Sequence, residues 1–174
     1  SYEKGVTGFE IAKSIGPRLA KDAVAIETNG TSADLNEKID ENAKIKIITF
    51  NDKQGLNALR HSLAHLLAAA VMELYPETKR TIGPPIENGF YYDFQFKKPI
   101  HEDDLPKIEK KMRELSQEDL PYERQMWPRQ EALQFFGNRG ESLKVELIKE
   151  KTVGESEVSC YTIKNLDTFV DFCT

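Results

Sequence analysis

The sequence predicts an α+β protein, because helical and strand patterns are mixed along the chain without strict β-α-β alternation. Apolar residues recur at helical spacing over residues 57–74 and 105–115, whereas residues 45–50 are mostly β-branched or aromatic, as is typical of a strand. A polar, turn-rich segment at residues 51–55 divides the chain. We therefore expect two domains, residues 1–52 and residues 53–174.

The first domain has the pattern of a small β-grasp-like unit. A helical pattern follows Thr7-Gly8 and is stopped by Gly16-Pro17. A strand is expected at residues 23–28, followed by a hairpin-type turn at Asn29-Gly30 and a second strand at residues 45–50. Strands about one helix in roughly 50 residues make a unit of marginal size for independent stability.

The second domain is expected to combine an antiparallel sheet with helices. Its first helix begins at about Asn57, a plausible N-cap, and its second carries an apolar stripe over residues 105–115. Pro128 is expected to start a short third helix. Alternating or β-branched residues predict strands at residues 143–147, 159–163 and 168–172.

Composition limits the classes of function. The chain has 174 residues, a net charge of −5 and two cysteines, which is too few for a disulfide framework. We see neither a secretory signal nor an apolar stretch that would span a membrane, so a cytoplasmic protein without a membrane partner is expected. The acidic balance argues against an independent nucleic-acid binder, so any RNA would be held mostly by another part of the protein.

The first helix of the second domain carries two of the three histidines, one turn apart. His61 and His65 fall on one face beside Ala58, Ala68 and Met72, opposite a broad leucine face, so both faces are expected to be buried or half-buried. Each histidine can be an ordinary core residue, the pair can chelate Zn²⁺, or one can act as a base that the other orients. The spacing alone does not decide between these interpretations.

Four further segments carry a family resemblance. Residues 60–67 (RHSLAHLL) and 82–93 (IGPPIENGFYYD) resemble the second N-terminal domain of threonyl-tRNA synthetases of the bacterial type, which alanyl-tRNA synthetases share. Residues 142–148 (SLKVELI) and 169–173 (FVDFC) are similar to two further motifs of that domain, in the same order. The part before residue 51 resembles the TGS domain that precedes it in this family. Together these segments cover nearly the whole chain.

The resemblance implies a proofreading activity, in which the domain hydrolyses the ester of tRNA(Thr) mischarged with serine. Serine lacks one methyl group of threonine, and such a difference supplies only about 1–3 kcal/mol of discrimination during activation. In the family, His61 orients the terminal ribose or the water, and Lys144 activates or holds that water. The expected catalytic residues are therefore His61 and Lys144, and the expected substrate-binding residues are His65, Tyr92, Asp171 and Cys173.

The resemblance also sets expectations about ligands and partners. The partners are the acceptor 3′ end of tRNA(Thr) with its amino acid, and the rest of the synthetase. No cofactor is expected here, because ATP, magnesium and zinc belong to an aminoacylation domain absent from this sequence. Zinc on His61, His65 and Cys173 is the less favoured alternative. The family motif continues past Cys173 to a further histidine, so the second domain is expected to be truncated, and a non-catalytic tRNA- or partner-binding fragment is the alternative function.

Overall fold

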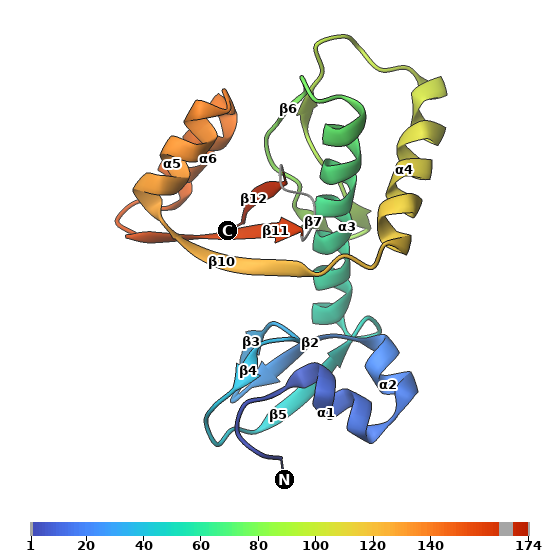
Figure 1. Cartoon of the computed structure of the whole chain (residues 1–174), viewed down its shortest axis with the longest axis vertical. Helices are drawn as coiled ribbons and strands as arrows, with labels where there is room; N and C mark the ends of the chain where they lie inside the picture. The colour runs from blue at the N-terminus through green and yellow to red at the C-terminus, as the bar shows by residue number, and fades with distance from the viewer. Residues whose placement is uncertain (1, 164–168, 174) are drawn as a thin grey trace. The chain divides into compact units, whose positions relative to one another are not determined.

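The computed structural model describes residues 2–163 and 169–173, with the side chain of Cys173 outside that description. The chain forms two compact units, the first from residues 1–62 with 85–89 and the second from residues 63–84 with 90–174. The division falls inside helix α3 (Lys53–Leu74), which contributes residues to each unit (Figure 1). The domain boundary expected after residue 52 stays a prediction.

Unit 1 holds a three-stranded antiparallel sheet with strand order β3-β2-β5 and a separate two-stranded pair, β1-β4. Its elements, in chain order, are β1 (Val6–Thr7), α1 (Gly8–Ile15), α2 (Pro17–Asp22), β2 (Ala23–Thr28), β3 (Thr31–Ala33), β4 (Lys38–Ile39) and β5 (Ile45–Thr49). Ile26 of β2 and Ala12 of α1 are fully buried, and a Cβ atom at Gly8 of α1 would lie 2.2 Å from the side chain of Ile26, so α1 packs on the face of the sheet that carries Ile26. Ile48 of β5 is also fully buried, but it lies opposite Ala25 in the register and points to the other face.

Local signals in the sequence account for the elements of unit 1. Thr7 caps α1 by accepting the backbone N–H of Glu10, whose carboxylate accepts the backbone N–H of Thr7 in return. Asn29 and Gly30 join β2 to β3 with φ angles of 51° and 87°, the left-handed conformation that a tight hairpin turn requires. The expected strands and turn of this part are thus present.

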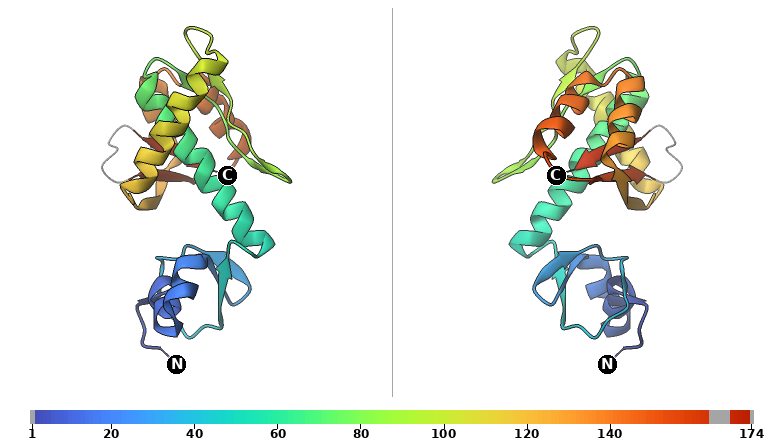
Figure 2. Two further views of the ribbon diagram at one scale, coloured as in Figure 1. Left: turned by 90° about the vertical axis from the view of Figure 1, so that its right-hand side faces the viewer. Right: turned by 90° about the vertical axis from the view of Figure 1, so that its left-hand side faces the viewer.

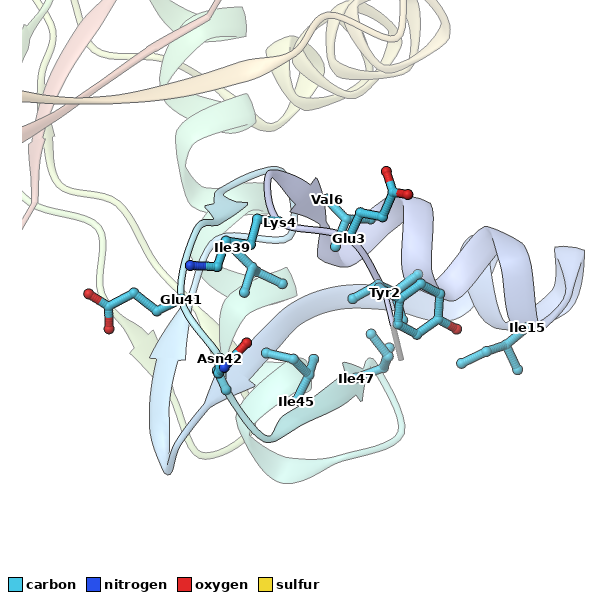
Figure 3. A pocket seen from close by; sticks show the side chains of 12 residues that line it. Tyr2, Glu3, Lys4, Val6, Ile15, Ile39, Glu41, Asn42, Ile45 and Ile47 are labelled. Carbon is cyan, nitrogen blue, oxygen red and sulfur yellow. The ribbon is translucent and has the colours of Figure 1, made fainter.

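A groove of about 420 Å³ lies on one side of unit 1 (Figure 3). Its lining combines the N-terminal residues with α1 and the chain from β4 to β5. The apolar side chains among its lining residues are Val6, Ile11, Ile15, Ile39, Ile45 and Ile47. Because Ile47 pairs with Ile26 of β2, Ile45 and Ile47 line the groove from the face of the sheet on which α1 packs.

Helix α3 begins at Lys53, four residues earlier than the Asn57 start that the sequence predicted. The backbone N–H of Leu56 already donates to the carbonyl of Asp52, at 2.8 Å. Gly55 permits this early start, because a Cβ atom there would lie 1.9 Å from the carbonyl oxygen of Thr49. Glycine in this polar segment therefore marks close packing of the first helical turn and not a linker.

Unit 2 is built on an antiparallel sheet with strand order β10-β11-β12. Its further elements are β6 (Lys79–Arg80), β9 (Phe94–Gln95), the 3-10 turn η1 (Glu102–Asp104), α4 (Leu105–Gln117), β10 (Tyr122–Pro128), α5 (Arg129–Asn138), α6 (Ser142–Lys151), β11 (Glu157–Ile163) and β12 (Val170–Cys173). Strands β6 and β9 pair antiparallel, and β7 (Pro85–Ile86) pairs with β8 (Gly89–Phe90).

Two clusters of buried side chains hold the elements of unit 2 together. Helices α5 and α6 lie side by side (Figure 1). They form the first cluster together with alternate residues of β11 and β12, and its members are Ala132, Phe136, Ile148, Val158, Cys160, Val170 and Phe172. Helices α3 and α4 contribute to the second, whose members are Ala68, Ala69, Ala70, Leu115, Ile163 and Phe169. Cys160 and Ile163 are an odd number of positions apart in β11, so their side chains point to opposite faces of the sheet. Each cluster therefore packs against one face. Figure 2 shows the helix pair and the sheet from two further sides.

Three expectations for unit 2 were wrong or incomplete. Residues 143–147 form part of α6 and not a strand: Lys144 and Ile148 are buried one turn apart, which overrides the local alternation of polar and apolar residues. Strand β10 was not predicted, because its residues between Tyr122 and Pro128 are mostly exposed and polar. The leucine face of α3 is not its buried face throughout, since Leu59 is exposed and alanines fill the core.

The predicted fold class is confirmed, because helices and antiparallel sheets are mixed along the chain. The helix with the two histidines is α3, which follows β5 and precedes β6 in the sequence. The helix expected to start at Pro128 is α5, which begins one residue later. Residue 168 of the last predicted strand lies outside the described residues, and the strand itself is β12. Among the helices that the structure describes, none has the length and apolar character that crossing a membrane requires.

Candidate active site

A carboxylate at the centre of unit 2 binds three side chains from separate elements. Asp171 of β12 accepts a hydrogen bond from Lys144 of α6, with 2.6 Å between Nζ and Oδ1. Its other oxygen, Oδ2, lies 3.1 Å from Nδ1 of His65 in α3 and accepts the hydroxyl of Tyr92 at 2.8 Å. Residues far apart in the sequence therefore meet at one carboxyl group.

The cluster is almost completely removed from solvent. Lys144 is 1% exposed, Asp171 2% and His65 4%, and Tyr92 is half-buried. Lysine and aspartate are rarely buried to this extent unless they are paired, because each charge loses its hydration. The short contact between the ammonium and the carboxylate compensates for that loss, so the pair is a specific feature of the interior and not a solvated surface pair.

The local structure explains why these side chains meet. Asp171 lies opposite Tyr161 in the β11-β12 register, so both residues point to the same face of the sheet. Tyr92 stacks on Phe94 with ring centroids 4.7 Å apart, and a Cβ atom at Gly83 would lie 2.1 Å from its ring. Glycine at position 83 therefore leaves the space in which the tyrosine ring lies.

Aromatic rings surround His65 on the side of the sheet. Its ring centroid lies 5.6 Å from that of Tyr161, 6.1 Å from that of Phe169 and 6.3 Å from that of Tyr122. Burial raises the pKa of Tyr122 to about 12, so this neighbour stays neutral near pH 7. The histidine is thus held by packing as well as by its hydrogen bond to Asp171.

Asp171 is ionised over the whole physiological pH range. Burial alone would raise the pKa of this carboxyl group, but the charges of Lys144 and Arg80 and the hydrogen bond from His65 outweigh burial and hold the pKa well below its usual range. An ionised carboxylate only accepts hydrogen bonds, so Nδ1 of a neutral His65 is the nitrogen that carries the proton. The arrangement fixes the tautomer and orientation of the imidazole, as the carboxylate of a hydrolytic triad does.

A second ion pair lies behind this cluster. Arg80 of β6 is 1% exposed and donates from Nε to Oε2 of Glu141 at 3.1 Å, and from Nη2 to the backbone carbonyl of Val170. Its guanidinium also lies over the ring of Phe169, with 5.0 Å to the centroid. Arg80 and Glu141 were not predicted from the sequence. In the sequence, Arg80 resembles a solvated arginine in a loop, and Glu141 resembles an acidic residue that flanks a helix.

The structure brings together four of the six residues that the sequence singled out: His65, Tyr92, Lys144 and Asp171. His61 is half-buried one turn before His65, in the part of α3 assigned to unit 1. Cys173 ends β12, and its side chain lies outside the described residues. Of the adjacent tyrosines, Tyr91 is 45% exposed and Tyr92 binds the carboxylate, so their side chains point in different directions.

Metal binding by the histidine helix stays untested. Within residues 2–163 and 169–172, no three His, Cys, Asp or Glu side chains converge as a metal site requires. The less favoured zinc set of His61, His65 and Cys173 includes a side chain outside that part of the chain. Cys160 is fully buried in the cluster beneath α5 and α6, where it packs as a small core residue.

Comparison with known proteins shows similarity along the whole chain. Residues 1–49 match the TGS domain family. The chain is 47% identical to the threonine–tRNA ligase of Francisella tularensis subsp. novicida over 172 residues, which cover 99% of this chain and 26% of that protein. It is 53% identical to the threonine–tRNA ligase of Rhizobium rhizogenes over 148 residues, which cover 85% of this chain and 22% of that protein. The chain thus spans about a quarter of the length of these curated relatives.

Proposed function

We propose, from the homology of this chain to the N-terminal region of bacterial threonine–tRNA ligase, that it is the proofreading part of such a ligase and hydrolyses the ester of tRNA(Thr) carrying serine. The observation that carries the proposal is the buried carboxylate of Asp171, bound at once by Lys144, His65 and Tyr92. Paired ionisable groups of this kind, far from solvent, are concentrated at functional sites.

A hydrolytic step of this kind answers a limit on amino-acid selection. A ligase for threonine binds serine with a loss of only one methyl contact, about 1–3 kcal/mol, so the first selection admits errors. A second site that accepts serine and excludes the threonine methyl group corrects them. Several polar groups held at fixed positions by mutual hydrogen bonds fit this requirement better than a flat RNA-binding surface does.

The proposed roles follow from the hydrogen bonds. Asp171 is an anion whose two oxygens are both engaged, so it orients its neighbours and anchors the substrate instead of abstracting a proton. Lys144 donates one N–H to that anion and has further N–H donors, with which it holds the water or stabilises the oxyanion that develops at the ester carbonyl. Of the two roles expected for Lys144, this favours holding the water over activating it.

His65 and Tyr92 complete the site in this proposal. Asp171 engages Nδ1 of His65, which directs the lone pair of a neutral imidazole to Nε2, the nitrogen suited to accept a hydrogen bond from the substrate or the water. Tyr92 donates its hydroxyl to Asp171, and Nζ of Lys144 lies over the face of its ring, 5.9 Å from the ring centroid. His61 is assigned to the ribose or the water, and Cys173 to the substrate pocket.

The test is hydrolysis of seryl-tRNA(Thr), with threonyl-tRNA(Thr) as the substrate control and a chelator in a parallel reaction. The 174-residue chain is compared with the full-length ligase to which, under this proposal, it belongs. We expect the seryl ester to be hydrolysed, the threonyl ester to be spared, and chelation to have no effect. His61→Ala is expected to abolish hydrolysis.

A matched pair of tyrosine variants makes the test specific to the cluster. Tyr92→Phe removes one hydrogen bond to a buried carboxylate and is expected to slow hydrolysis about 10-fold or more. Tyr91→Phe removes the hydroxyl of the adjacent, exposed tyrosine and is expected to leave the rate unchanged. If the ligase and the chain bind the acceptor end but hydrolyse neither ester, the region is a tRNA-binding fragment and the hydrolytic proposal is wrong.

A further inference from the structure

The elements that present Lys144 and Asp171 are tied together by a third charged group, the guanidinium of Arg80. Its Nη2 binds the carbonyl of Val170, the residue that directly precedes Asp171 in β12. Its Nε binds Glu141, the residue that directly precedes α6, 3.1 Å away. One rigid planar group therefore contacts the backbone beside the anion and the start of the helix that carries the cation.

The contact at Val170 has a structural cause. In the described sheet, β12 is the outer strand, paired with β11 alone, so a carbonyl on its outer edge needs a donor from outside the sheet. Arg80 supplies that donor from β6. The position of Asp171 along β12 is thereby set from both edges, by the ladder with β11 on one side and by the arginine on the other.

We infer that Arg80 is a positioning residue of the candidate active site, which holds Asp171 and the start of α6 in register so that the Lys144 ammonium and the carboxylate meet. This inference rests on the proposed function for its effect on hydrolysis, but not for its effect on the carboxylate. Arg80 touches neither Lys144 nor the carboxylate oxygens in a hydrogen bond that the structure describes, so it acts through Val170 and Glu141.

The protonation of Asp171 reports on this arrangement without any substrate. The groups that face its carboxylate are His65 from α3, Arg80 from β6, Tyr92 from the segment after β8 and Lys144 from α6. Cys160 of β11 is on the opposite face of the sheet and interacts with the carboxylate through its charge only. Of these, the charges of Lys144 and Arg80 act most strongly against the effect of burial. Removal of Arg80 therefore raises the pKa of Asp171, through the lost charge and through any displacement of Lys144.

Glu141 offers a matched control, because it binds two arginines. Arg139 donates to Oε1 of Glu141 at 3.0 Å from the more exposed side, and Arg80 donates to Oε2 from the interior. Arg80→Met and Arg139→Met each remove one ion pair with the same carboxylate. Only the first also removes the donor to Val170 and a positive charge near Asp171.

The experiment follows the side-chain carboxyl carbon of Asp171 by NMR as pH is lowered, in the full 174-residue chain, and measures hydrolysis of seryl-tRNA(Thr) by the same proteins. For Arg80→Met we expect the pKa of Asp171 to shift upward and hydrolysis to fall roughly 10- to 100-fold, as a displacement of about 1 Å in a catalytic group does. For Arg139→Met we expect the titration of Asp171 to match that of the parent chain.

Arg80→Lys keeps the inference testable if Arg80→Met does not fold. A lysine retains the charge but cannot donate to Glu141 and to Val170 with the geometry of a guanidinium. We expect it to keep the pKa of Asp171 low and still to lose about 10-fold in hydrolysis, a separation that loss of charge alone does not produce. Full hydrolysis by Arg80→Lys, or identical Asp171 titrations in Arg80→Met and Arg139→Met, overturns the inference.

The same data separate the inference from the proposed function. If the parent chain and the full-length ligase do not hydrolyse seryl-tRNA(Thr) while Arg80→Met still raises the pKa of Asp171 and Arg139→Met does not, the hydrolytic function fails and the interaction of Arg80 with Asp171 stands. If the parent hydrolyses the ester and Arg80→Met changes neither hydrolysis nor the titration, the function stands and the positioning role fails.

Discussion

Replacement of Lys144 by methionine should destabilise unit 2 strongly, because it leaves the Asp171 carboxylate buried without its nearest cation. With 2.6 Å between Nζ and Oδ1 and an effective dielectric constant of about 20, the attraction between the charges is about 6 kcal/mol. Part of it offsets the desolvation of the two groups. Removal of one partner of such a buried pair costs about 3–5 kcal/mol, and we expect Lys144→Met to fall in this range.

The assay is unfolding in urea, followed by the fluorescence of Trp127. This residue is the single tryptophan of the chain and lies in β10, so its signal reports on the unit that contains the pair. With a dependence on urea of about 2 kcal/mol per molar, the expected loss lowers the midpoint by about 1.5–2.5 M. The double variant Lys144→Met with Asp171→Asn should lose less than the sum of the two single variants.

Lys110 provides the control for this experiment. It pairs with Glu114 of the same helix at 3.8 Å on the surface of α4, so Lys110→Met should cost no more than about 0.5 kcal/mol. The two variants make the same chemical change at a buried and at an exposed ion pair. A loss below about 1 kcal/mol for Lys144→Met would show that the pair is solvated in solution, and the argument from its burial would be wrong.

Three further outcomes follow from the same geometry. The pKa of Asp171 in the folded state lies below its unfolded value of about 3.9. The ionised carboxylate therefore stabilises the folded state above that pH, and this contribution is lost as pH falls through the folded pKa. Asp171→Asn should flatten the acid side of a plot of melting temperature against pH. Gly83→Ala should cost about 1–3 kcal/mol because its Cβ would overlap the ring of Tyr92, whereas Gly137→Ala, with open space around it in α5, should stabilise by up to about 1 kcal/mol; urea unfolding measures both. Burial, with a smaller contribution from Asp171, raises the pKa of the Cys160 thiol to about 12, so mass-spectrometric mapping should find it unalkylated at pH 8 in the folded chain and alkylated in urea.

Sequence patterns predicted those parts of the fold that local interactions determine. The Asn29-Gly30 turn and the helix after Thr7 depend on residues within four positions of one another, and both are present. Local rules of this kind need no knowledge of the tertiary contacts.

The missed elements depend on partners distant in the sequence. Residues 143–147 alternate as a strand does, but Lys144 and Ile148 are buried by Asp171 and by the core under α5 while Glu146 between them is exposed. A strand would place all three on one face, whereas a helix separates Glu146 from the other two. Arg80 has the same explanation, since nothing near it in sequence identifies Glu141 or Val170 as its partners. Four of the site residues were predicted through family motifs; without these motifs, Lys144 would have been interpreted as a solvated lysine, Asp171 as an ordinary acid at a strand end, and His65 and Tyr92 as residues of the core or its edge.

Both oxygens of Asp171 already accept hydrogen bonds, so under the proposed function a neighbouring group takes the proton. One oxygen is bound by Lys144 and the other by His65 and Tyr92, so under the proposed function this anion orients other groups, and the imidazole of His65, which can donate and accept hydrogen bonds, handles the proton. Asp171→Asn tests this division. An amide can donate as well as accept, so it no longer selects the Nδ1–H form of His65. We expect the nitrogen NMR signals of His65 to shift toward a mixture of tautomers and hydrolysis to fall by more than 10-fold; unchanged His65 signals would show that the carboxylate does not set the tautomer, and Asp171 would then be a structural anion only.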